Sequence, residues 1–208
     1  MRENNKEILF ARTFSLMLTH NIGDLTLDEV EKSTGFTRGA IFYYAKNKME
    51  FFRQVLISQV LDKQDIHNKM NYSEGMSLKE FIKAYIDGII RTREYYLETT
   101  KGPYPENPTH AYLLILLQIK RYYPDLGERY AAIMEAEREL WKKVLIDAVR
   151  SGEINPPSNL DTVAAIFQSL FYGSAFQAAI AKDFDSDSLK TQMMEYYGSL
   201  CVKDLQNL

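Results

Sequence analysis

A cluster of side chains near the N-terminus has the chemistry of a nucleic-acid contact. Thr37, Arg38 and Gly39 are consecutive. They are followed by four side chains that could donate hydrogen bonds to DNA phosphates: Tyr43, Tyr44, Lys46 and Lys48. An arginine can form two parallel hydrogen bonds to the O6 and N7 atoms of guanine, and a glycine allows a close backbone approach. Residues 34–48 include three cations and no acid. This composition predicts a local basic surface that binds DNA.

Two short helices must position these groups. The run from Thr26 to Glu29 fits a capping box, which predicts a helix over 26–35 that ends at Gly35. Thr37 is a good N-cap for a second, short helix. Two such helices joined by a glycine-containing turn fit a helix-turn-helix, in which the start of the second helix faces base edges. An ordinary helical corner explains the spacing as well, with core tyrosines and solvated lysines.

The whole chain has the periodicity of an all-α protein. It has 208 residues, 46% of them hydrophobic and 25% charged, a net charge of −3 and one cysteine. Apolar residues recur every three or four positions, and no strand alternation is present. No stretch reaches about 18 uncharged apolar residues, so we expect a cytoplasmic protein without a membrane span. About nine helices are predicted, over 3–20, 26–35, from 37, 47–70, 77–99, 109–121, 124–151, 159–182 and 187–205.

The N-terminal region resembles the TetR family of bacterial transcriptional regulators. The resemblance covers residues 9–52 and is carried by TLDEV at 26–30 and GFTRGAIFYYAKNK at 35–48. The family pattern over the second run is Gly, apolar, Ser/Thr, any, Gly/Ala, any, apolar, Tyr/Phe, Tyr, His, Phe and a following Lys. The chain departs from that pattern at Tyr44 and Ala45, and it has Glu31 and Thr34 where a small alanine is usual.

The resemblance implies a role for each matching residue. Thr26 would contact a phosphate at a helix N-terminus, where the dipole favours anions. Thr37, Arg38 and Gly39 would face bases, and Tyr43, Tyr44 and Lys48 would bind backbone phosphate. The implied architecture is a three-helix DNA-binding domain over 1–48 and a larger helical domain over 49–208 for effector binding and dimerisation. Such a protein is a repressor, and its homodimer, paired through 159–205, binds a pseudo-palindromic operator and leaves it when a small molecule binds.

The larger domain is rich in aromatic residues that could line an effector pocket. The candidates are Tyr85, Tyr112, Phe167 and Phe171, and the predicted effector is a small apolar or aromatic molecule. For any single ring, core or dimer packing is the more common role. Three prolines in 101–108 exclude a continuous helix, so this segment is either a gate of the pocket or a plain connector.

Other classes of protein find less support in the sequence. The three histidines, His20, His67 and His110, are far apart and the single cysteine has no partner, so we expect no metal site. No phosphate-binding glycine loop or nucleophile elbow is present, and we expect no cofactor and no enzymatic activity. Two alternatives stay open: a small all-α enzyme that uses tyrosine hydroxyls or His110, and a helix-turn-helix protein without an effector.

Overall fold

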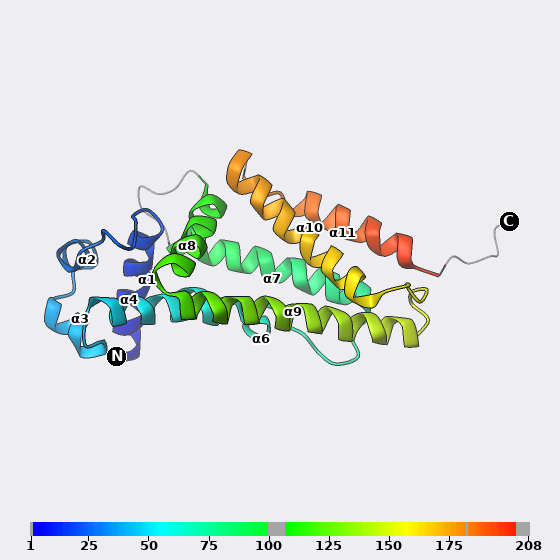
Figure 1. The fold of residues 1–208 in the computed structure, drawn as a ribbon, viewed down its shortest axis with the longest axis horizontal. Coiled ribbons are helices and arrows are strands. Elements are labelled where there is room, and N and C mark those ends of the chain that lie inside the picture. The colour runs from blue at the N-terminus through cyan, green and yellow to red at the C-terminus, as the bar shows by residue number, and fades with distance from the viewer. Residues whose placement is uncertain (1, 100–106, 182, 203–208) are drawn as a thin grey trace.

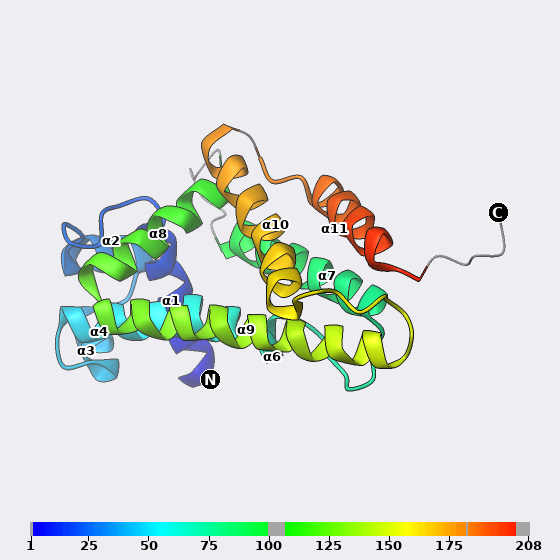
Figure 2. The same cartoon turned by 45° about the vertical axis from the view of Figure 1, so that its right-hand side comes forward.

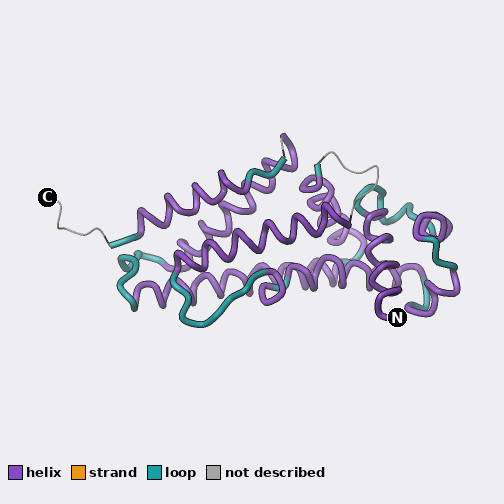
Figure 3. The backbone as a smooth tube through the Cα atoms, turned by 180° about the vertical axis from the view of Figure 1, so that it is seen from behind, coloured by secondary structure: helices purple, strands orange, loops and turns teal. Residues whose placement is uncertain are grey.

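The computed structural model describes residues 2–99, 107–181 and 183–202. These residues form an elongated helical molecule, with the N-terminal helices at one end (Figure 1), and helices are its only regular elements (Figure 3). The elements are α1 (Arg2–Met17), α2 (Leu27–Thr34), α3 (Arg38–Tyr44), α4 (Lys48–Leu56), the π-helical η1 (Ile57–Leu61), α5 (Asp62–Gln64), α6 (Ile66–Lys69), α7 (Leu78–Thr99), α8 (Pro108–Tyr122), α9 (Pro124–Arg150), α10 (Leu160–Ala181) and α11 (Ser186–Leu200). If α4, η1, α5 and α6 are counted as the one helix predicted there, the described residues contain the nine expected helices.

Local capping groups explain most of the ends of the helices in the N-terminal region. The Thr26 side chain accepts the Glu29 backbone N–H, the Glu29 side chain accepts the Thr26 backbone N–H, and Gly35 closes α2 at a φ of 74°. Thr37 caps α3. The predicted end of the first helix at 20 was wrong, since α1 ends at Met17. The Thr19 hydroxyl donates a hydrogen bond to the Leu16 carbonyl at 2.9 Å. This side-chain bond competes with the helical backbone bonds and favours a turn after Met17.

The prediction of one continuous helix over 47–70 was also wrong. After α4 the backbone widens into η1, in which the Asp62 N–H donates to the Ile57 carbonyl five residues earlier. The chain then leaves helical geometry at Asp65, where ψ is 128°. A tertiary contact accompanies the widened turn, because the Tyr96 hydroxyl donates to the Gln59 carbonyl at 3.0 Å.

Two hydrophobic clusters hold the molecule together. The first joins α1–α4 and η1 to parts of α7, α8 and α9, with Phe10, Phe14, Phe51 and Phe52 fully enclosed. The second joins α7, α9, α10 and α11 around Trp141, whose ring stacks on Phe167 at 4.7 Å between centroids. Each fully buried aromatic or aliphatic side chain contributes about 1.5–3 kcal/mol. Because α9 has buried residues in both clusters and runs along the molecule, it ties the N-terminal end to the rest (Figure 2).

Helix α10 is the most apolar element. Its length and composition alone would suffice for a membrane crossing, with a mean hydropathy of 1.3 over the most apolar window. One third of that window is buried against the rest of the molecule, in contact with α8, α9 and α11. A helix that packs in a soluble core meets the same criterion.

Candidate DNA-binding and effector sites

The residues predicted to face bases lie together at the exposed start of α3. Thr37 is the N-cap, and its Oγ1 accepts the Ala40 N–H at 3.3 Å. Arg38 is the first residue of the helix. Gly39 leaves the surface open, since a Cβ built there would be 3.9 Å from the nearest atom, Thr37 Oγ1. Helices α2 and α3 form one end of the elongated molecule (Figure 1), so the start of α3 lies at that end.

Arg38 is engaged by two carboxylates of α2. Its guanidinium forms ion pairs with Asp28 and with Glu31, the latter at 2.9 Å, and its Nε donates to Glu31 Oε2 at 3.1 Å. Glu31 is the main cause that raises the pKa of Arg38. The side chain therefore has to leave both acids before it can reach a base. Sequence reasoning identified Glu31 only as a departure from alanine and missed this contact across the turn.

Two of the predicted phosphate contacts have exposed side chains. Tyr43 is 70% exposed. Thr26 is exposed at the start of α2, where its hydroxyl donates to Glu29 Oε2 at 2.7 Å. The hydrogen bonds from Thr26 lower the pKa of Glu29. A phosphate at this helix end would meet the Glu29 carboxylate, which already accepts the backbone N–H and the hydroxyl of Thr26.

The other two predicted phosphate contacts are partly structural. Tyr44 is half-buried, and its ring packs edge-on against Phe10 at 6.1 Å between centroids. Lys48 Nζ donates to the Leu25 carbonyl at 3.1 Å and lies 5.7 Å from the centre of the Phe52 ring. Lys48 thus fastens the start of α4 to the loop before α2, and only part of its side chain faces solvent.

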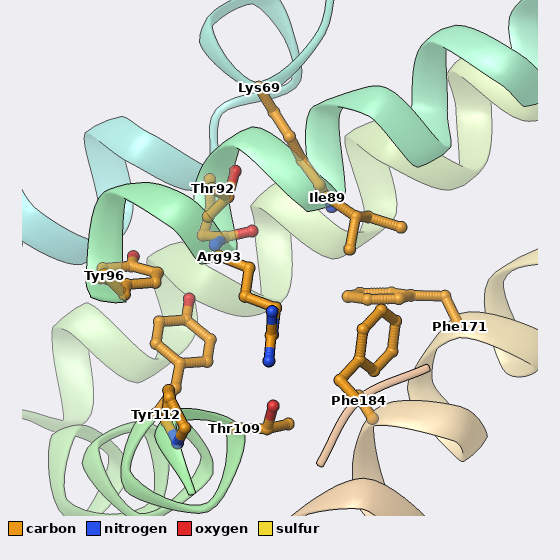
Figure 4. Close-up of a pocket in the computed structure, with 12 residues that line it drawn as sticks. Lys69, Ile89, Thr92, Arg93, Tyr96, Thr109, Tyr112, Phe171 and Phe184 are labelled. Atoms are coloured by element: carbon orange, nitrogen blue, oxygen red, sulfur yellow. The ribbon is translucent and has the colours of Figure 1, made fainter. Parts of the chain in front are cut away.

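A cavity lies between α7, α8 and α10, beside the ends of α5 and α6 (Figure 4). The cavity volume, counted as the space that the centre of a water-sized sphere can occupy, is about 90 Å³. A single water needs about 10–15 Å³ by this measure, so the cavity has room for more than one water. Two of the four predicted effector contacts, Tyr112 and Phe171, line it. The other two, Tyr85 and Phe167, are fully buried and do not line it. Burial raises the pKa of Tyr112 well above its usual range, which keeps this phenol protonated.

Lys69 lines one wall of the cavity and belongs to a buried ion pair. Lys69 Nζ lies 3.2 Å from Glu137 Oε2, and both side chains are 3% exposed. The carboxylate also accepts the Tyr85 hydroxyl at 2.8 Å, so the charges are paired within a low-dielectric region. Lys69 is 4.8 Å from the centre of the Phe171 ring. Gly88 makes this wall possible, since a Cβ there would be 2.5 Å from the Lys69 carbonyl oxygen.

Arg93 of α7 extends into the middle of the cavity, toward Thr109 and Phe184 (Figure 4). Its Nη2 donates to both carboxylate oxygens of Asp183, at 2.7 and 2.6 Å. Its Nε is buried and has no hydrogen-bond partner within the described parts of the chain. Arg93 is the main cause that lowers the pKa of Asp183. Sequence reasoning missed both residues because they stand 90 positions apart and neither belongs to a motif.

The segment predicted as a gate of the cavity is described only at its end. Residues 100–106 lie outside the described residues, so most of the 101–108 segment does too. Asn107 caps α8 by accepting the His110 N–H at 3.0 Å, and Pro108 lines the cavity. The His110 ring has Nδ1 2.9 Å from the Ala179 carbonyl oxygen. Within the described ranges, no group of three or more histidine, cysteine or acidic residues could hold a metal ion.

A run of contacts connects the cavity with the helix-turn-helix end. Tyr96 lines the cavity and bonds to Gln59 of η1, and η1 continues directly from α4. Arg53 of α4 forms an ion pair with Asp125 of α9. Near the first helices, the Gln118 side chain of α8 accepts the Ile22 N–H at 2.6 Å. The N-terminal helices are therefore attached to the elements that line the cavity.

Comparisons with known proteins find regulators of one family. The chain is 19% identical over 204 residues to the HTH-type transcriptional regulator SrpR of Pseudomonas putida, covering 95% of this chain and 86% of that protein. No protein-family model matches the sequence. A TetR-family regulator from a Rhodococcus species has a similar structure, with a TM-score of 0.70, 14% identity and coverage of 95% and 98% of the two chains. Reduced Escherichia coli NemR gives a TM-score of 0.60, 16% identity and coverage of 97% and 99%.

Proposed function

We propose that this chain, which has the fold of the TetR family of transcriptional regulators, is a DNA-binding regulator that releases its operator when a small molecule occupies the cavity. Residues 1–48 would contact DNA, and residues 49–208 would bind the effector and pair two chains. The observation that carries the proposal is the exposed start of α3, where Thr37, Arg38 and Gly39 face solvent on the same short helix as the exposed Tyr43. A recognition helix needs this arrangement to reach base edges in a major groove.

An uncovered face of α10 supports pairing through the C-terminal helices. The residues on this face recur at alternating steps of three and four, and they are Ile166, Ser169, Gly173, Phe176 and Ile180. Phe176 and Ile180 are 58% and 68% exposed. A seam with this period fits a second helix of the same kind in a two-fold interface. Two recognition helices related by that axis would require two half-sites separated by about one helical turn of DNA or a multiple of it.

The proposed release requires two conformations of the whole chain, which differ both at the cavity and at the helix-turn-helix. An effector shifts the DNA-competent population only through its different affinity for those states. The continuous path from α4 through η1 to Gln64 and Lys69 of the cavity supports such coupling. Reciprocity then demands that DNA weaken effector binding by the same factor by which effector weakens DNA binding.

Selection of DNA by the full chain tests this function. The purified protein is mixed with fragmented genomic DNA or a random library, and the bound sequences are footprinted. We expect a pseudo-palindrome occupied by two chains. A single asymmetric half-site bound by one chain would overturn the dimer, and no selection above bulk DNA would overturn the regulator. An enzyme with this fold would give the second result.

A further inference from the structure

We propose that the cavity recognises a small organic acid, whose carboxylate binds Arg93 in place of Asp183 while its apolar body packs against the surrounding rings. This inference rests on the proposed function and narrows the effector to a charged class. The apolar or aromatic effector expected from the sequence describes the ring surface of the cavity but leaves out Arg93 at its centre (Figure 4).

The charges at the cavity wall favour an anion over a cation. The two charged residues that line it, Lys69 and Arg93, are both basic. The Lys69 charge is already balanced by the buried Glu137, which lies behind the wall. Among the described residues, Arg93 pairs with Asp183, whose side chain is 61% exposed. A positively charged ligand would meet a guanidinium at the centre of the cavity, and a purely apolar ligand would leave the buried Nε–H without an acceptor.

Asp183 occupies only part of the binding edge of Arg93. Both of its oxygens accept from Nη2, and the neighbouring Nε–H donates to no described group. A guanidinium binds a carboxylate best through two parallel N–H groups, and the edge made by Nε and Nη2 is such a fork. A ligand carboxylate on that edge would make both bonds and compete with Asp183 for Nη2. Asp183 is thus an internal stand-in for the ligand.

The rest of the lining fits a short apolar body. Rings of Tyr96, Tyr112, Phe171 and Phe184 surround the guanidinium. Their hydrophobic area favours an aromatic or branched chain beside the acid group. Displacement of Asp183 would also free Phe184, the next residue, whose backbone N–H donates to Asp183 Oδ1 at 2.9 Å.

Three probes of similar size separate charge from shape: phenylacetate, its isosteric amide phenylacetamide, and phenethylammonium. Their binding to the full-length protein is measured by titration calorimetry and by the shift in melting temperature. Acids of other lengths, benzoate, 3-phenylpropionate and octanoate, complete the series. We expect at least one acid to bind about tenfold or more tightly than its amide, since charge-assisted bonds are the stronger ones. The ammonium compound should bind more weakly than the amide.

Variants identify the residues responsible. Arg93→Gln should abolish the preference for acid over amide. Asp183→Asn should raise acid affinity roughly two- to fivefold, because it removes a competing exposed ion pair, and should leave amide affinity unchanged. Asp147→Asn is the matched control, since it removes an exposed carboxylate that pairs with Arg150 outside the cavity lining. The control should not change acid binding.

Specific results would overturn the inference. These are equal binding of acid and amide, an unchanged preference in Arg93→Gln, weaker acid binding in Asp183→Asn, or failure of every acid to bind wild type and Asp183→Asn. Release of the selected DNA is measured with the same compounds. If acids bind through Arg93 but leave DNA affinity unchanged, the result supports the anion site and contradicts its role as an effector switch. If only neutral compounds bind and release DNA, the regulator stands and the anion site falls.

Discussion

Arg38 has two sets of partners that exclude one another. In the DNA-free molecule its guanidinium lies against Asp28 and Glu31, and in the proposed complex it faces a base. Exposed ion pairs of this kind are weak because water screens them, whereas a bidentate base contact discriminates by about 1–3 kcal/mol. The exchange therefore favours DNA at the correct base and costs affinity at the wrong one.

Variants of this cluster should separate base reading from general charge. Arg38→Ala should cost about 1–3 kcal/mol of operator binding and relax the preference at one base pair. Asp28→Asn should tighten binding roughly two- to fivefold by releasing Arg38. Asp24→Asn is the control for charge alone, because this exposed acid lies outside the ion-pair cluster. Competition binding to the selected site and single-base variants gives the measurement.

A double variant decides whether Asp28 acts through Arg38. In Asp28→Asn with Arg38→Ala, the gain from the first change should disappear, because its only route is the released guanidinium. If the gain persists or equals that of Asp24→Asn, Asp28 acts by general repulsion of phosphate. If Arg38→Ala weakens all sequences equally, Arg38 does not read a base.

At the scale of single elements, helix ends with their own caps could be predicted and tertiary contacts could not. The caps at Thr26, Thr37 and Asn47 use groups within three residues, so the sequence contains the complete signal. The break at Asp65 and the π-helical turn lie beside partners from α7 that no local pattern indicates. The same holds for the candidate sites: the start of α3 is a contiguous motif, whereas Arg93 and Asp183 meet only after α7 and α10 have packed.

The approach of α6 to α7 depends on Gly88. Replacing Gly88 by alanine would put a methyl group 2.5 Å from the Lys69 carbonyl oxygen. The gain in helix propensity of up to about 1 kcal/mol should be outweighed by about 1–3 kcal/mol of overpacking, so the free energy of unfolding should fall. Urea denaturation measures the change. Gly198→Ala in α11 is the matched control, since its Cβ meets no atom within 4 Å, and should not destabilise; equal effects would show that Gly88 makes no critical contact.

For the whole molecule, the uncovered face of α10 predicts a dimer that one charge can break. Phe176→Glu would place an ionised group in the proposed seam, where burial without a partner costs several kcal/mol. We expect monomers by sedimentation, an unchanged helical content and loss of tight operator binding. Leu117→Glu on α8 is the control, because Leu117 is 61% exposed and lies off this face. A Phe176→Glu protein that sediments as the wild type would place the interface elsewhere.

Buried tyrosines make the molecule sensitive to alkali. Burial raises the pKa of Tyr123 and of Tyr130 to about 12, compared with about 10 in an unfolded chain. Above pH 10 the unfolded state loses these protons first. Stability contributed by the neutral phenols is therefore complete below pH 10 and is lost as pH rises toward 12. Each phenol should lower the free energy of unfolding by about 1.4 kcal/mol per pH unit in that window.

Urea denaturation at pH 8, 9, 10 and 11 measures this slope, with pH 8–9 as the reference plateau. Tyr123→Phe should remove one proton's share of the slope above pH 10. Its lost hydrogen bond to the Met49 carbonyl, at 3.3 Å, affects all pH values alike. A slope that stays the same in Tyr123→Phe would show that this phenol ionises as easily in the folded chain as in the unfolded one.

The π-helical turn at Ile57–Leu61 also bears on how the chain tolerates changes of length. A π-helical turn contains one residue more than an α-helical turn needs. Deletion of one residue there, such as Ser58, would convert the turn to α geometry and keep Phe52 on one side and Gln64 on the other in their present orientations. The same deletion one turn earlier, within α4, would rotate every following side chain by about 100°. Loss of one codon in this segment during evolution would therefore keep the side chains before and after it in their present orientations.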